Sequence, residues 1–146
     1  MTPSPATGRD AAEQLVRRYY DTFNRGDRAA FLALLADEVV HDISQGDRQT
    51  GRDTFAAFMA HMDRFYREQV SELVVMTEAT GTQAAARFIV QGSYIATDPG
   101  VPATTPPAHG QHYRLPAGAF FTLRDGRVTG IANHYNLADW VRQIGG

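Results

Sequence analysis

The chain has 146 residues, of which 43% are hydrophobic, enough for one domain with a core and a pocket. Its net charge is −2 and the 14 basic residues do not cluster, so no nucleic-acid partner is expected. The absence of cysteine excludes disulfides and thiolate chemistry. The sequence shows neither a membrane-spanning run nor the pattern of a signal peptide, so we expect a cytoplasmic protein with no membrane partner.

The first stretch predicts a tail followed by a helix. Residues 1–9, rich in proline, serine, threonine and glycine, indicate a flexible N-terminal tail, and residues 10–146 then form a single domain. Asp10 and Glu13 have capping-box spacing, which predicts a helix over residues 11–24. One face of this helix carries apolar side chains four residues apart: Leu15, Tyr19 and Phe23.

Two further helices are predicted before the strands begin. Asp27 can cap a short second helix that carries Phe31 and Leu34. Thr50 and Asp53 repeat the capping spacing and predict a third helix. The apolar face of the third helix suits either a core or the wall of an adaptable pocket, and it consists of Phe55, Phe58, Met59, Met62 and Phe65 or Tyr66.

Between these helices lies an apolar, β-branched run that contains a carboxylate, the VVHDI sequence of residues 39–43. It predicts a strand, in which Val40 and Asp42 share one side and His41 lies on the other. If the side of Val40 faces the core, Asp42 is a buried carboxylate, and burial raises its pKa toward a value useful for proton transfer. The alternative is that Asp42 ends the strand, turns outward and caps the loop over residues 44–47.

From residue 69 onward the pattern changes to strands joined by turns, predicted over residues 69–80, 83–97, 111–123 and 127–135. Pro116 and Gly118 are points at which the third of these strands can break. Residues 98–110 contain four prolines, which no regular element tolerates, and a loop of this length is a candidate lid. Asn136 caps a final short helix that carries Trp140.

Three helices followed by hairpin-linked strands indicate an α+β fold rather than a repeated βαβ fold. A strongly curved mixed or antiparallel sheet can wrap around the three N-terminal helices and leave a cone-shaped pocket at one end. The outer face of that sheet holds Ile89 and Ile95 among polar residues. A half-apolar exposed face needs cover, which predicts a homodimer through the outer sheet face.

Several short sequences together carry a family resemblance, namely Arg18-Tyr19, Asn24-Arg25-Gly26-Asp27, the Leu35-to-Asp42 run, Thr50-Gly51-Arg52 and Asp125-Gly126-Arg127-Val128. In their order and spacing, the chain resembles the cone-shaped α+β family that includes nuclear transport factor 2, ketosteroid isomerase and the SnoaL-like polyketide cyclases. The resemblance runs from about Asp10 to Ile144. The closing YNLADW sequence of residues 135–140 is similar to the group described as ketosteroid isomerase-related.

The resemblance implies roles for two residues and leaves a third catalytic role without a matching residue. Tyr19 falls where ketosteroid isomerase has its oxyanion-hole tyrosine, and Asp42 falls where it has its aspartate base. The protonated aspartate of that enzyme, like the catalytic acid of the SnoaL cyclases, corresponds to about Ala119. The second-strand histidine of the cyclases corresponds roughly to Tyr94. This chain therefore lacks one carboxylate of either pattern.

The last predicted strand supplies another polar candidate. Ile131, Asn133 and Tyr135 share one face, which the resemblance makes the pocket face. Asn133 can then donate a hydrogen bond to a carbonyl or enolate oxygen. His134 points the other way, unless the register slips by one residue and brings it into the pocket as a base.

The sequence therefore predicts a cofactor-independent acid/base enzyme acting on a hydrophobic ketone, as an isomerase or a polyketide cyclase. Asp42 abstracts a proton next to the carbonyl, while Tyr19 and Asn133 donate to the enolate. The alternative is a non-catalytic small-molecule-binding protein or a dimeric interaction protein of the same fold. Neither metal-ligand spacing nor a phosphate loop is present, so no metal or cofactor is expected. The expected substrate-binding residues are Phe23, Phe55, Phe58, Met59, Met62, Phe88, Val90, Tyr94, Phe121, Tyr135 and Trp140.

Overall fold

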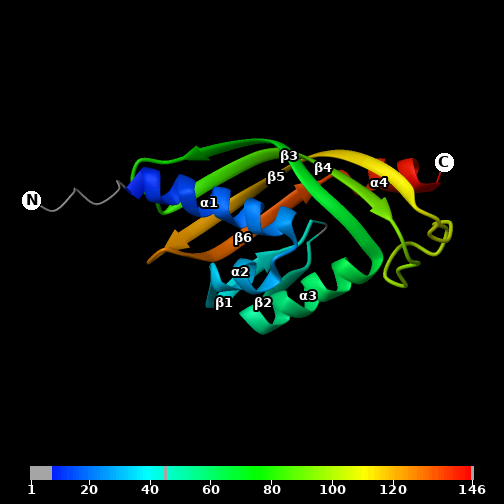
Figure 1. Cartoon of the computed structure of the whole chain (residues 1–146), viewed down its shortest axis with the longest axis horizontal. Helices are drawn as coiled ribbons and strands as arrows, with labels where there is room; N and C mark the ends of the chain where they lie inside the picture. The colour runs from blue at the N-terminus through cyan, green and yellow to red at the C-terminus, as the bar shows by residue number, and fades with distance from the viewer. Residues whose placement is uncertain (1–7, 45, 146) are drawn as a thin grey trace, which may run out of the picture.

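The computed structural model describes residues 8–44 and 46–145, and Figure 1 shows the course of the chain. Its elements are α1 (Gly8–Arg25), α2 (Arg28–Ala33), β1 (Leu35–Asp42), β2 (Arg48–Thr50), α3 (Arg52–Phe65), β3 (Tyr66–Thr77), β4 (Gln83–Tyr94), β5 (Gln111–Arg124), β6 (Arg127–Tyr135) and α4 (Leu137–Gly145). Of the predicted tail, residues 1–7 lie outside the described residues, whereas Gly8 and Arg9 already belong to α1.

The six strands form one sheet in the order β2-β1-β6-β5-β4-β3. β1 and β6 run parallel, and all other neighbours are antiparallel. The sheet curves around α1, with α2 and α3 beside β1 (Figure 1). We call the face that packs on α1 the inner face and the opposite one the outer face. The predicted α+β fold, with three N-terminal helices, a curved mixed sheet and a short C-terminal helix, is confirmed.

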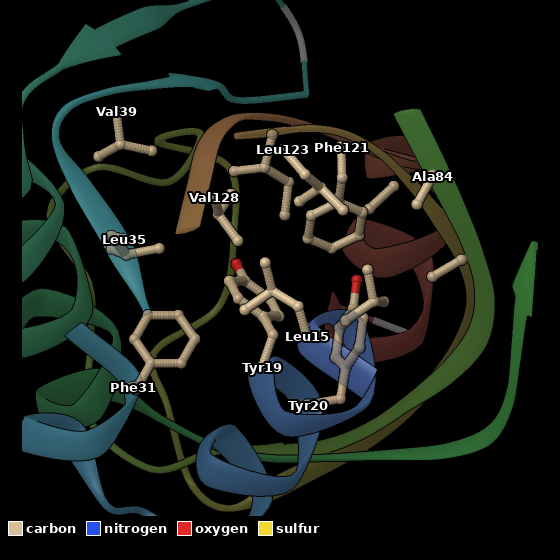
Figure 2. Packing of buried hydrophobic residues seen from close by; sticks show 14 of the residues in the cluster. Leu15, Tyr19, Tyr20, Phe31, Leu35, Val39, Ala84, Phe121, Leu123 and Val128 are labelled. Carbon is tan, nitrogen blue, oxygen red and sulfur yellow. The ribbon is translucent and has the colours of Figure 1, made fainter. Parts of the chain in front are cut away.

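The main core lies where α1 packs on the inner face (Figure 2). Every third or fourth side chain of α1 is buried, so one stripe of the helix is apolar. Tyr19 packs edge-on against Phe121 of β5 with ring centroids 5.2 Å apart, and Tyr20 packs on Phe88 of β4 at 4.9 Å. The result is a closed aromatic core in which Phe121 is only 1% exposed.

A second, smaller core forms under α4. Trp140 packs edge-on against three tyrosines of the sheet: Tyr66, Tyr94 and Tyr113. β6 pairs with β5 only from Ala117 onward, so the first half of β5 has a free edge. The Gln143 side chain of α4 fills this edge, since it accepts from the backbone N–H of Arg114 at 2.7 Å and donates to its carbonyl at 2.9 Å.

The free edge also explains why β5 is unbroken at Pro116 and Gly118. Backbone groups of alternate residues point to the same side of a strand, so the nitrogen of Pro116 points where that of Arg114 does. No strand lies on that side at Pro116, since β6 ends opposite Ala117. Proline therefore removes no ladder hydrogen bond there.

The first hairpin differs from the prediction. Residues 48–50, for which no strand was predicted, form β2, which pairs with the end of β1. Thr50 is therefore not the cap of α3. The cap is Gly51, whose φ of 101° favours glycine, and no side chain bonds to this end of the helix. Asp27, in contrast, caps α2 as predicted, because its Oδ1 accepts from the Ala30 N–H at 3.1 Å.

Asn24, in one of the short sequences of the resemblance, has a structural role. Its side-chain amide donates to the Val70 carbonyl and accepts from the Val70 N–H, both at 2.8 Å. The end of α1 is thereby fixed to the edge strand β3.

The proline-rich loop between β4 and β5 is tied to the rest of the fold through Asp98, which is 6% exposed. Its Oδ2 accepts from the Tyr66 hydroxyl at 2.7 Å and lies 3.0 Å from His61 Nε2 of α3. The Tyr94 hydroxyl accepts from the Asp98 N–H at 2.7 Å. This end of the predicted lid is thus bound to α3, β3 and β4.

Candidate functional site

The inner face divides into a closed and an open stretch. The closed stretch lies under α1 and is described above. On the open stretch, beside α3 and α4, side chains that point inward remain partly exposed, so solvent reaches this part of the face. It consists of Phe58, Met62, Glu68, Val90, Ala117, Asn133 and Tyr135.

β1 presents a histidine to the inside and its aspartate to the outside. Val39 is fully buried and His41 is 2% exposed, so these two residues face inward. Asp42 faces away from the core, where it pairs with Arg48 of β2 through contacts of 2.6 and 3.0 Å. The Asp42 side chain is 40% exposed.

The expectation of a buried Asp42 with a raised pKa is therefore wrong. The hydrogen bonds from the Arg48 guanidinium hold the pKa of Asp42 below its usual value. The cause lies in the alternation of β1, since Val39 and His41, and not Val40, pack against the core. Asp42 thus ends the strand and turns outward, and its partner is the strand β2 rather than the loop over residues 44–47.

His41 is the polar group that β1 buries. Its ring stacks on Phe55 of α3 with centroids 4.4 Å apart and meets Phe58 edge-on at 4.9 Å. Its Nε2 lies 3.0 Å from the amide nitrogen of Asn133 on β6, and its Nδ1 is buried with no hydrogen-bond partner among the described residues. Burial lowers the pKa of His41 from 6.5 to about 4, so the imidazole is neutral at pH 7.

Asn133 connects His41 to the open stretch, because it contacts the imidazole and is itself partly exposed. Asn133 is half-exposed and lies on the inner face, as the alternation of β6 predicted. His134 lies on the outer face, where its ring meets the exposed Phe120 with centroids 5.6 Å apart. The register therefore leaves His41, and not His134, as the imidazole of the inner face.

Two arrangements of the Asn133 amide fit the contact with His41. When Nδ2 donates to Nε2, the ring proton lies on Nδ1. When the amide is turned over, Nε2 donates to Oδ1, and the lone pair lies on Nδ1. In both arrangements Nδ1 stays buried, and Nε2 is the ring nitrogen that faces Asn133 and the open stretch.

Tyr19 lies in the closed stretch. It is 5% exposed and surrounded by the rings of Tyr20, Phe31 and Phe121. Burial raises the pKa of its hydroxyl well above the usual value, so the phenol stays neutral. Figure 2 shows Tyr19 among aliphatic and aromatic side chains of the main core. This placement favours packing over contact with a ligand.

The eleven expected substrate-binding residues divide between core and open stretch. Six are buried and thus supply packing, namely Phe55, Met59, Phe88, Tyr94, Phe121 and Trp140. Four lie on the open stretch, namely Phe58, Met62, Val90 and Tyr135. The last, Phe23, is half-buried near the end of α1, and the Arg28 guanidinium lies over its ring at 5.1 Å.

The sequence patterns did not predict one inward-facing carboxylate, that of Glu68. Glu68 of β3 lies in one cross-strand row with Gly92 and Tyr113, and the Tyr113 hydroxyl donates to its Oε2 at 2.6 Å. Burial raises the pKa of Glu68. The sequence prediction began this strand at Gln69, because the apolar pattern of the third helix continues to Tyr66. Had the strand been extended by one residue, alternation would have placed Glu68 on the face of Val70.

Two surface hollows reach residues of the open stretch. One, of about 580 Å³, has side chains of the outer face around it, including Arg67 and Arg114, and is also lined by Glu68, Gly92 and Tyr113. The other, of about 380 Å³, lies at the parallel ends of β1 and β6, where Asp42 and Asn133 both line it.

Within residues 8–44 and 46–145, no group of three or more histidine, cysteine, aspartate or glutamate side chains is arranged to hold a metal ion. Among the helices of the same residues, there is no candidate membrane span.

A curved sheet around an N-terminal helix is also the fold of a nuclear transport factor 2-like protein from Burkholderia pseudomallei K96243, which is 20% identical with a TM-score of 0.70 over 93% of this chain and 98% of that one. The sequence pattern of the SnoaL-like domain matches residues 16–131. The chain therefore belongs to the SnoaL-like family. No curated protein matches its sequence.

Solved structures agree with this membership. A candidate polyketide cyclase from Pseudomonas putida KT2440 is 50% identical, with a TM-score of 0.86 over 96% of this chain and 99% of that one. A candidate polyketide cyclase from Xanthomonas campestris is 46% identical, with a TM-score of 0.90 over 94% and 99%. A third, from Silicibacter sp. TM1040, is 41% identical, with a TM-score of 0.87 over 93% and 96%.

Proposed function

We propose that this chain is a cofactor-independent enzyme that moves a proton next to the carbonyl of a hydrophobic ketone, as an isomerase or a cyclase does. The observation that carries the proposal is the His41–Asn133 pair at the edge of the open stretch. A neutral imidazole with an unpartnered Nδ1 is a costly feature to bury. The similarity to candidate polyketide cyclases supports the same class of substrate.

The chemistry uses the arrangement in which Asn133 Nδ2 donates to His41 Nε2 and the ring proton lies on Nδ1. The ketone displaces the Asn133 amide from Nε2. The lone pair on Nε2 then takes the proton from the carbon next to the carbonyl, and the electron pair of that bond moves into the enolate. Asn133 Nδ2 donates to the enolate oxygen. The proton on Nε2 then returns to carbon or to oxygen, depending on the reaction. One positioned acid or base typically contributes ~10²–10⁴-fold to the rate.

The test compares neighbouring residues of β1 that face opposite ways. Wild type, His41→Gln and Asp42→Asn are assayed on conjugating and cyclising ketones by ultraviolet absorbance. We expect His41→Gln to lower kcat by ~10²-fold or more, because it removes the base. Asp42→Asn changes a group outside the open stretch and keeps most of the rate. If Asp42→Asn loses the rate and His41→Gln keeps it, the base is Asp42 and the proposal is wrong.

A second candidate function is binding of the ketone without turnover. It is favoured by Ala119, which lies opposite Asn133 on β5 and supplies no carboxylate there. Wild-type protein that binds such ketones and returns them unchanged, with no solvent deuterium incorporated, supports this candidate. Incorporation of deuterium next to the carbonyl excludes it.

We also propose that the outer face forms a homodimer. Met76, Ala85 and Phe120 lie in one cross-strand row on that face. Phe120 is 62% exposed and Met76 is 51% exposed, which is unfavourable for an isolated domain in water.

A further inference from the structure

The carboxylate of Glu68 is held in place by a feature of three strands. Gly92 lies between Glu68 and Tyr113 in their cross-strand row. The Tyr113 ring lies so close over Gly92 that a Cβ there would come within 2.4 Å of the ring carbon Cζ. Only glycine leaves room for the ring to cross β4 and deliver its hydroxyl to Glu68. The carboxylate is therefore oriented by packing as well as by a hydrogen bond.

Glu68 has no cation in contact with it. Among residues 8–44 and 46–145, the Tyr113 hydroxyl is its side-chain partner, through Oε2, and no group donates to Oε1. The nearby Arg28 is held by Asp63 through contacts of 2.8 and 2.5 Å. The charge of Arg28 acts on Glu68 from a distance and lowers its pKa, against the larger effect of burial, but the two side chains form no ion pair. Its free oxygen is thus available to a ligand.

The surroundings of Glu68 are rings that carry hydroxyl groups. The charge of Glu68 raises the pKa of Tyr66, Tyr113 and Tyr135, in addition to the effect of burial on each. Tyr135 belongs to the open stretch and follows Asn133 on the inner side of β6. Glu68 and Asn133 therefore border the same stretch of the inner face from two ends.

The spacing of these ends sets the size of a ligand that meets both. Asn133 lies opposite Ala119, and Tyr113 is six residues away on β5. Six residues of a strand span about 20 Å, and three strand spacings from β6 to β3 add about 14 Å across the sheet. Because both side chains reach inward over a concave face, the gap between them shortens to the order of 10–15 Å. The small side chain of Ala117 lies on the inner face between them. A flat molecule of two or three fused rings fits this distance.

We propose that Glu68, oriented by Tyr113, forms a second subsite that accepts a hydrogen bond from a hydroxyl group at the end of the substrate remote from the reacting ketone. The inference rests on the proposed function and narrows it. The substrate is a flat hydroxyketone of two or three rings, with its ketone at Asn133 and its hydroxyl at Glu68. Burial, which raises the pKa of Glu68, agrees with an oxygen placed among rings rather than in bulk water.

The test uses two probes that differ only in the remote hydroxyl, 2-acetylnaphthalene and 6-hydroxy-2-acetylnaphthalene. Their dissociation constants are measured by fluorescence titration for wild type and for Glu68→Gln, which keeps the size of the side chain. Wild type should bind the hydroxylated probe about tenfold more tightly, as expected for a hydrogen bond to a charged group. Glu68→Gln should lose most of this preference and bind 2-acetylnaphthalene as wild type does.

Glu72→Gln is the matched control, because Glu72 is an exposed carboxylate of the same strand that pairs with Arg114. It should keep the preference. Tyr113→Phe is a second variant, which should weaken the preference by releasing the carboxylate. The proposal is overturned if wild type does not prefer the hydroxylated probe, or if Glu68→Gln keeps the preference.

The two proposals fail separately. His41→Gln should abolish turnover and leave the hydroxyl preference intact, since it acts at the other end of the ligand. A preference that depends on Glu68 in a protein without turnover contradicts the reaction but keeps the subsite. Turnover in a protein that shows no such preference contradicts the subsite but keeps the reaction.

Discussion

The closed and open stretches of the inner face share one sheet and differ in what covers them. Under α1, aromatic rings from the helix fill the concave side, and Phe121 is 1% exposed. Beside α3 and α4, inward-facing residues such as Asn133 and Glu68 remain partly exposed. The helix α1 therefore closes only part of the curved sheet, and the proposed ligand site lies in the uncovered part.

The same comparison separates two kinds of buried polar group. Tyr19 and Tyr20 are amphipathic side chains in the closed stretch, where their rings supply contact area. His41 lies at the border and is joined to the open stretch by Asn133. A tyrosine in the closed stretch therefore acts as a packing residue, whereas an imidazole at the border of that stretch can contact a ligand.

The largest expected effect on stability comes from removing a ring of the closed stretch. Phe121→Ala should lower the free energy of unfolding by about 3–5 kcal/mol, because it leaves a cavity between Tyr19 and Tyr20. Met62→Ala, in the open stretch, should cost about 1 kcal/mol, because solvent already reaches Met62. Urea unfolding measures both. Equal losses would contradict the division of the inner face.

The next effect concerns pH. The pKa of His41 is about 4 in the folded protein and 6.5 in the unfolded chain, so between these values the unfolded chain binds more protons. The free energy of unfolding should therefore rise with pH from about 4 to 6.5, by about 3 kcal/mol from this group. Thermal unfolding across this range measures it. His41→Gln should flatten the rise, and an unchanged slope in that variant would show that the imidazole is not buried neutral.

A smaller effect is expected at the proline-rich loop, which closes the second core rather than the open stretch. Asp98→Ala removes the acceptor of the Tyr66 hydroxyl and the Gly100 N–H. The loss should be about 2 kcal/mol, and protease cleavage of the loop should become faster. Asp47→Ala, at an exposed turn, is the control and should change neither measurement. If the loop of Asp98→Ala resists the protease as well as the wild-type loop does, Asp98 does not hold the loop in place.

The smallest effect on the fold is expected on the outer face. Phe120→Asp should leave the thermal midpoint of dilute protein nearly unchanged, because the ring is 62% exposed. If the outer face forms the dimer, the same variant should be monomeric by light scattering while wild type is dimeric. Thr122→Asp is the control, because Thr122 is an exposed residue two positions along β5 from Phe120. A Phe120→Asp dimer would place the interface elsewhere.

The order of elements could be predicted from the sequence because local signals agree with the fold. The periodicity of α1, the Asp27 cap and the turn at residues 124–126 each act over a few residues. Asp42 and His41 show a property that such local signals do not determine. Alternation puts them on opposite sides of β1, but only the packing of Phe55 on His41 decides which side is inward.

Glu68 could not be found for a related reason. The last apolar residues of α3 and the first residues of β3 follow each other without a turn, since Phe65 ends the helix and Tyr66 begins the strand. A boundary without glycine or proline gives no local signal. The contact of Glu68 with Tyr113 spans 45 residues and depends on the strand register, which a sequence pattern does not contain.

The central claim is that the neutral imidazole of His41 meets the ketone. Nitrogen NMR of ¹⁵N-histidine protein, assigned with His41→Gln, measures the state of both ring nitrogens with and without 2-acetylnaphthalene. We predict a neutral ring from pH 5 to 8 and a shift of Nε2 when the ketone is added, in wild type and in Asp42→Asn alike. A ring that takes up a proton near pH 6.5, or ring nitrogens unchanged by saturating ketone, would contradict it.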